Sequence, residues 1–190
     1  HSYVEGEKRN ELWRIMNMTE KEYLTKHYTY TTDAERIRGI VLSVSVKIEF
    51  FISKILTDYF IKDKGMKPDF FRFFLSNTMT FSQKSTAFSE LVKEGKIKVD
   101  KRYNHFFKDL SYFRKVRNKM AHCDIYENPE IVKNYLRDEI VFMSFSNENY
   151  GIKVIFRMKE NAEENESELI YSIDKFTTRA QTFVTAIKSI

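Results

Sequence analysis

The chain has 190 residues, of which 42% are hydrophobic and 15% aromatic, and this is enough apolar material for one substantial core. With five glycines and two prolines, long uninterrupted segments dominate, so the composition favours helices and argues against a glycine-rich phosphate loop. The formal net charge of +5 permits an anionic partner, but acidic and basic residues are interspersed as on ordinary solvated helices.

Cysteine content and hydropathy narrow the class of protein further. A single cysteine, Cys123, excludes an internal disulfide and leaves no cysteine-based set of metal ligands. No segment is apolar over the length of a membrane span, and no basic-then-apolar signal leads the sequence. We therefore expect a cytoplasmic protein that uses no metal and no other cofactor.

The first part of the chain carries apolar residues at helical spacing. Residues 5–28 predict one or two helices with a junction near residues 17–19, where Thr19 and Glu22 have the spacing of a capping box. His27 lies among tyrosines in this region, and we interpret it as a packed or half-exposed histidine rather than a catalytic one.

The longest periodic segment follows a second capping-box pattern, Thr32-Asp33-Ala34-Glu35. Apolar residues recur from here at intervals of three and four, which predicts a helix over residues 33–61. The β-branched content makes a strand the local alternative for residues 39–46, but only the helical period fits the whole stripe.

Two shorter helices are expected next. Residues 70–75 are rich in phenylalanine, and we interpret this cluster as core rather than as a platform for stacking bases. The stretch Thr80-Phe81-Ser82-Gln83 then begins a helix that ends near residues 94–95.

A further helix is predicted from residue 104 to about residue 122. Its inward stripe consists of apolar side chains: Phe106, Leu110, Phe113, Val116 and Met120. Polar and basic residues lie beside or opposite this stripe.

After residue 122 the period of the pattern changes. Residues 140–146 and 152–158 alternate as two strands of a hairpin, and residues 169–173 could form a third strand. Between them, residues 160–168 are acidic and polar, as is typical of a mobile loop. Asp174 caps a last amphipathic helix.

These elements predict a mainly α fold in a single domain over residues 1–190. Its helical core would comprise about residues 33–125 with 174–190. A β-hairpin or small antiparallel sheet would form an insertion over about residues 140–173, before the last helix.

The candidate catalytic residues are Arg117, Asn118 and His122, within the stretch Arg117-Asn118-x-x-Ala121-His122. Asn118 and His122 stand four residues apart and share one helix face, whereas Arg117 lies about 140° around the helix from His122. A long arginine reach, fraying of the helix near Cys123, or a second copy across a two-fold axis could unite them. The spacing favours a dimeric site.

Such a site could cleave RNA by transesterification. A histidine with a pKa near 6.5 can take a proton from a 2′-hydroxyl or give one to the leaving oxygen. An arginine can place two donors on a phosphate whose oxygens gain charge, and an asparagine can orient the imidazole.

The stretch resembles the arginine, polar residue, short gap, histidine signature of HEPN domains, a helical family that includes many RNases of toxin and antiviral systems. Glu35-Arg36-x-Arg38-Gly39 and Phe81-Ser82-Gln83-Lys84 also look like the mannitol-operon-repressor branch of similar helical proteins. The resemblance covers roughly residues 33–125, and the hairpin and acidic loop depart from the minimal four-helix pattern.

The resemblance implies a helical bundle, a homodimer with facing motif helices, and a cleft where Arg117 and His122 from both chains meet RNA. Arg114, Lys115 and Lys119 would contact RNA in such a cleft, and otherwise form a solvated face. An antitoxin or a regulatory protein would be a possible partner.

Three alternatives stay open. Arg117 and Asn118 could hold a helix end, with His122 on a C-terminal carbonyl, in a catalytically silent regulatory or protein-interaction module of the repressor type. Cys123 could be a nucleophile, although a small buried residue is the stronger interpretation. Direct DNA binding ranks last, because no helix-turn-helix with a basic recognition helix stands out.

Overall fold

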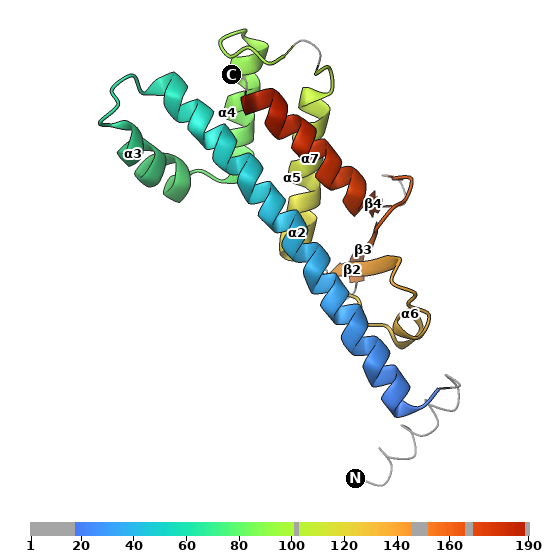
Figure 1. The fold of residues 1–190 in the computed structure, drawn as a ribbon. Helices are drawn as coiled ribbons and strands as arrows, with labels where there is room; N and C mark the ends of the chain where they lie inside the picture. Colours follow the sequence, from blue (N-terminus) through green and yellow to red (C-terminus); the bar gives the residue numbers. More distant parts are fainter. Residues whose placement is uncertain (1–17, 101–102, 146–151, 166–168, 189–190) are drawn as a thin grey trace. The chain divides into compact units, whose positions relative to one another are not determined.

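The computed structural model describes residues 18–100, 103–145, 152–165 and 169–188 (Figure 1). The chain is mainly α-helical with a small four-stranded sheet before the last helix, so the predicted fold class is confirmed. The helix predicted before residue 18 and the turn over residues 147–151 lie outside the described residues.

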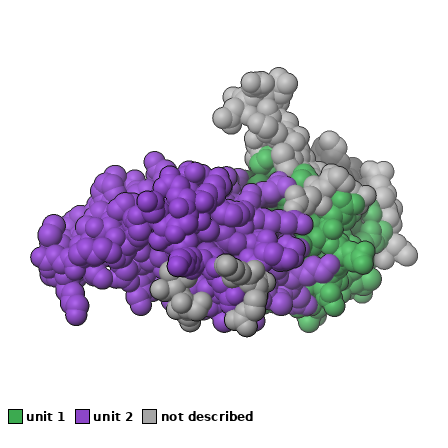
Figure 2. All heavy atoms as spheres, turned by 90° about the horizontal axis from the view of Figure 1, so that it is seen from above, with its two compact units in different colours: residues 1–38, 123–173 green, residues 39–122, 174–190 purple. Residues whose placement is uncertain are grey.

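The chain divides into two compact units (Figure 2). The first comprises residues 1–38 and 123–173, and the second comprises residues 39–122 and 174–190. The expectation of a single domain stays a prediction.

Helix α2 runs without interruption over Glu20–Phe60, 41 residues. The capping box at its start is confirmed, because the Thr19 N–H donates to the Glu22 carboxylate at 2.7 Å and the Glu22 N–H donates to the Thr19 hydroxyl at 3.2 Å. The prediction of a separate helix beginning at residue 33 is wrong.

The second capping-box pattern lies inside α2 because the buried stripe does not break there. Tyr30, Ala34 and Ile37 are buried in succession at helical spacing, and burial of this stripe stabilises a helix that continues through residue 32. The Thr31 hydroxyl donates to the His27 carbonyl one turn earlier, as threonines within helices do. Residues 39–46 are helical as well, which excludes the strand alternative.

The first unit contains the sheet. Its elements after residue 122 are β1 (Asp124–Ile125), α6 (Pro129–Lys133), β2 (Glu139–Phe145), β3 (Ile152–Lys159) and β4 (Ile170–Ser172). The strand order is β1-β2-β3-β4, with β1, β2 and β3 antiparallel and β4 parallel to β3. The predicted hairpin and third strand are confirmed, whereas β1 was not predicted.

Tyrosines attach the start of α2 to this sheet. The buried Tyr30 hydroxyl accepts the Val141 N–H at 3.1 Å and lies 3.2 Å from the carbonyl oxygens of Tyr126 and Val141, as their donor. The Tyr135 hydroxyl donates to Asp33 at 2.8 Å, and its ring meets Tyr30 edge-on. These bonds satisfy groups that burial would otherwise leave unpaired.

The second unit contains the rest of α2 and a set of shorter helices. They are α3 (Lys67–Asp69), the π-helical segment η1 (Phe70–Ser76), α4 (Phe81–Lys93), α5 (Phe106–His122) and α7 (Ile173–Lys188). Thr80 and Gln83 form the capping box of α4, and Gly95 follows its end with φ +68°, a conformation that glycine adopts readily. The predicted bounds of α4 are confirmed.

One aromatic prediction fails in this unit. Leu75 is buried, but Phe73 and Phe74 on η1 are exposed, with 59% and 49% of their surface accessible. Phe50 on α2 is exposed as well and meets Phe71 edge-on at 5.6 Å. This cluster is therefore in part a surface patch, because a short helix at the surface buries only one of its sides.

Candidate functional site

Helix α5 is held by the apolar stripe that the sequence predicted. Phe106, Leu110, Phe113, Val116 and Met120 are all buried. Phe106 meets Phe88 of α4 edge-on at 5.4 Å and stacks on Phe183 of α7 at 5.3 Å. Phe113 meets Phe176 and Phe183 edge-on. Aromatic contacts of this kind fix both the position and the rotation of α5, and so decide which residues face outward.

The polar residues of the motif lie at the C-terminal end of α5. Asn118 and His122 are exposed and Arg117 is half-buried. The helix remains regular through His122, so fraying before this residue does not occur. Asn118 and His122 thus lie about 40° apart around the helix axis, while Arg117 lies about 140° from His122.

Arg117 and Asn118 are the only two of the three candidates that the described structure brings into contact. Arg117 Nη1 donates to Asn118 Oδ1 at 3.1 Å. No residue in the described ranges hydrogen-bonds to the His122 imidazole. One chain therefore presents an exposed histidine beside an asparagine whose carbonyl oxygen is held by an arginine.

The end of α5 has a different hydrogen-bond donor from the one suggested by the sequence. Arg38 donates to the Cys123 carbonyl at 2.5 Å, and its guanidinium lies 5.6 Å from the centre of the Phe142 ring. The interpretation of His122 as a cap for a C-terminal carbonyl is therefore not supported within the described residues. Cys123 is buried, as expected for a structural residue.

Sequence reasoning missed Arg38 as a neighbour of the motif. It appeared only within the stretch that resembles the repressor branch, and 85 residues separate it from Cys123. Periodicity shows which face of a helix is buried, but it does not show which distant carbonyl a long side chain reaches. An arginine beside a buried stripe is the only available signal, and that signal is weak.

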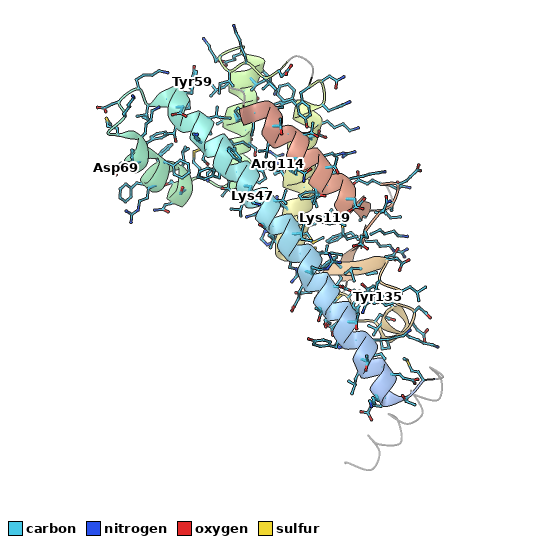
Figure 3. All side chains as sticks on the ribbon, viewed as in Figure 1. Lys47, Tyr59, Asp69, Arg114, Lys119 and Tyr135 are labelled. Atoms are coloured by element: carbon cyan, nitrogen blue, oxygen red, sulfur yellow. The ribbon has the colours of Figure 1, made fainter. Side chains whose placement is uncertain are left out.

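The three candidate RNA-binding residues differ in position. By the 100° rotation per residue, Lys115 lies about 20° from His122 and Lys119 about 60° away, whereas Arg114 lies about 80° away. Lys115 is exposed, and Arg114 and Lys119, both labelled in Figure 3, are half-buried. The two lysines therefore share the outward side of α5 with His122.

His27, the other histidine discussed above, has a structural partner. Its Nε2 lies 2.8 Å from Glu127 Oε2, and its side chain is one-third exposed. The interpretation of a half-exposed, non-catalytic histidine is consistent with this contact.

No described part of the chain gathers three His, Cys, Asp or Glu side chains in a way that could hold a metal ion. None of the described helices combines the length and the hydropathy needed to cross a membrane.

Comparison of the chain with protein-family models, with curated proteins and with solved structures gave no match.

Proposed function

We propose that the chain is a homodimeric, metal-independent endoribonuclease of the HEPN type, with a toxin or phage-defence role. The observation that carries this proposal is the His122 imidazole, which is exposed on a regular helix with no described hydrogen-bond partner. A general acid or base needs this access to a substrate proton. Asn118 and two lysines on the same side of α5 supply polar contacts for RNA.

In the proposed reaction, the 2′-hydroxyl oxygen of a ribose attacks the adjacent phosphorus. His122 removes the hydroxyl proton or protonates the departing 5′-oxygen, the two roles that an imidazole can take in this reaction. Arg117 donates to the phosphate oxygens as they gain charge, and Asn118 orients the imidazole or donates to the same oxygens. The products are a 2′,3′-cyclic phosphate and a 5′-hydroxyl.

The proposed site requires a second copy of the chain. Arg117 and His122 diverge by about 140° on one helix, so a phosphate contacted by both would lie between two copies of α5 related by a two-fold axis. One copy would then contribute Arg117 and the other His122 to each phosphate. Arg117 would also exchange its contact with Asn118 for one with the phosphate.

The test is RNA cleavage by the purified chain in excess EDTA, with end-labelled single-stranded and structured RNA and analysis of the new termini. We expect cyclic phosphates at the cleavage site, and loss of cleavage in His122→Ala and Arg117→Ala. Two matched controls, His27→Gln and Arg72→Ala, change a histidine and an arginine outside the site and should cleave normally. Light scattering gives the oligomeric state of each variant. Cleavage that survives His122→Ala would contradict the assignment.

A catalytically silent regulatory module is the second candidate. It is favoured by the exposed aromatic side chains Phe50, Phe73 and Phe74, since exposed apolar patches mark protein-interaction surfaces. A correctly folded dimer that cleaves none of the RNAs would favour this candidate. Co-purification with a specific regulatory protein, lost when Phe73 and Phe74 are changed to serine, would then identify the surface.

A further inference from the structure

A pocket of about 270 Å³ opens beside the N-terminal end of α5, at the opposite end of that helix from His122. It lies within the unit of residues 39–122 and 174–190, between α5 and α7, which cross in Figure 1 and contact each other through aromatic side chains. Every residue that lines it carries a polar group beside its apolar atoms: Tyr103, His105, Lys108, Asp109, Thr178, Arg179 and Thr182. Neither the fold nor the proposed cleavage reaction accounts for this concentration of polar side chains.

The pocket has one cationic side chain on each wall. Arg179 comes from α7 and its guanidinium lies 4.6 Å from the centre of the Tyr112 ring, which orients it. Lys108 comes from the first turn of α5 and is exposed. The first backbone N–H groups of a helix have no partner within it, and they add partial positive charge beside Lys108.

The acidic side chain of the pocket is already engaged. Asp109 is buried, with 6% of its surface accessible, and its carboxylate accepts a hydrogen bond from the Tyr103 hydroxyl. Burial and this bond raise the pKa of Tyr103, so the phenol keeps its proton at neutral pH. Asp109 offsets one of the two cations, and the lining retains a net positive charge.

Hydroxyl groups complete the α7 wall. Thr182 donates to the Thr178 carbonyl at 3.1 Å, one turn earlier, so its hydroxyl would have to exchange this carbonyl for an oxygen of the ligand. Thr178 is exposed and supplies a further hydroxyl. The volume is close to the lower end of the range for small-molecule sites, about 300–1,000 Å³, so the ligand or the bound part of it is small.

We propose that this pocket binds a phosphate monoester group, with Arg179 and Lys108 contacting its oxygens from opposite helices. Two cations on different elements and a helix N-terminus match a compact dianion better than a single negative charge. The group could belong to a free mononucleotide or to the 5′ end of an RNA strand. The site is independent of His122, so it stands whether or not the chain cleaves RNA.

The test is calorimetric binding with the whole chain and five probes. The probes are inorganic phosphate, adenosine 5′-monophosphate, adenosine, and one short oligoribonucleotide with either a 5′-phosphate or a 5′-hydroxyl. The oligonucleotides are measured in the His122→Ala variant, so that cleavage does not interfere. Lys108→Gln and Arg179→Gln remove the proposed contacts, and Lys47→Gln on α2 (Figure 3) is the matched control.

We expect the phosphorylated probes to bind and adenosine not to bind. The 5′-hydroxyl oligonucleotide should bind more weakly than its 5′-phosphorylated counterpart, because it keeps only the contacts on the His122 side of α5. Loss of one charge-assisted contact should weaken binding by about tenfold or more in Lys108→Gln and Arg179→Gln, with no change in Lys47→Gln. Because Arg179 also stacks on Tyr112, the melting temperature of its variant is compared without ligand. Lys108→Gln leaves that stacking intact and tests the pocket by itself.

The probes also separate the two sources of the group. Binding of adenosine 5′-monophosphate identifies a mononucleotide site. Tighter binding of the 5′-phosphorylated than of the 5′-hydroxyl oligonucleotide, without binding of the mononucleotide, identifies an RNA 5′ end. Either outcome supports the proposal. No binding at millimolar concentrations, or equal binding by all variants, would overturn it.

Discussion

Arg38 donates a 2.5 Å hydrogen bond to the backbone carbonyl of Cys123, the residue that directly follows His122. Carbonyls at a helix end have no partner within the helix, and here a side chain from another helix supplies one. The same guanidinium lies over the Phe142 ring. The backbone immediately after the candidate catalytic histidine is thus held by a residue that takes no part in the proposed reaction.

Replacing Arg38 with methionine should lower the free energy of unfolding by about 1–3 kcal/mol, because the change leaves a carbonyl without its charged donor. Urea denaturation measures this. Arg36→Met is the matched control, since Arg36 is 49% exposed and makes only surface ion pairs that contribute about 0–1 kcal/mol. Equal losses in the two variants would contradict a specific role for Arg38.

The ion pair between Lys84 of α4 and Glu49 of α2 offers a second test. The two side chains lie 2.6 Å apart, and Lys84 is 3% exposed. Glu49→Ala leaves the lysine buried without its partner and should cost about 3–5 kcal/mol of stability. Adding Lys84→Met should restore a large part of this loss, because the unpaired charge is then removed. A double-mutant cycle by urea denaturation measures the coupling, and additive losses would contradict it.

Several tyrosines should titrate late at alkaline pH. Burial raises the pKa of Tyr30 to about 12, and it also raises the pKa values of Tyr103 and Tyr135, which in addition donate hydrogen bonds to Asp109 and Asp33. A raised pKa in the folded state favours the protonated form, so the contribution of Tyr30 to stability is complete below about pH 10. It is lost as the pH rises from about 10 to 12.

Absorbance titration of phenolate in the folded and urea-unfolded protein measures this shift. The folded protein should retain a group of tyrosines that ionise only as it unfolds, and Tyr135→Phe should reduce that group by one. Identical titration curves in the two states would refute the prediction.

The proposed dimeric site predicts complementation between two inactive variants. A mixed dimer of His122→Ala and Arg117→Ala chains has one site with both mutations and one intact site, if each site takes its arginine and its histidine from different chains. Random mixing makes half of the dimers mixed, so about a quarter of the wild-type cleavage should return.

The measurement is the cleavage rate after the two variants are unfolded together and refolded. A mixture of two samples refolded separately is the control, and it should stay inactive if chains do not exchange. A site confined to one chain would give no recovery in either sample.

Much of the fold could be predicted because it depends on local patterns. The inward stripe of α5, the hairpin of β2 and β3 and the cap at Thr80 all follow from spacing that neighbouring residues determine. Thr32 and Glu35 show the limit of such patterns. Their spacing is that of a capping box, but the buried residues on either side keep α2 continuous, and tertiary packing overrides the local signal.

The residues of the candidate site could be predicted from the sequence, but the residues that surround them could not. The pattern located Arg117, Asn118 and His122 and gave their angles, because a regular helix sets them. It could not show that Arg38 reaches Cys123, nor that Phe73 and Phe74 are exposed, because both depend on residues far away in the chain. The pocket between α5 and α7 is a similar case, since about 70 residues separate Lys108 from Arg179.

The aromatic contacts that α5 makes with α7 also have a consequence for protein synthesis. Phe113 packs against Phe176 and Phe183, which follow it in the sequence by more than 60 residues. At roughly 5–20 residues per second, several seconds of translation pass before those partners are made. During that interval the nascent α5 lacks the packing that orients it, so its residues reach their final orientation only after the last helix has been synthesised.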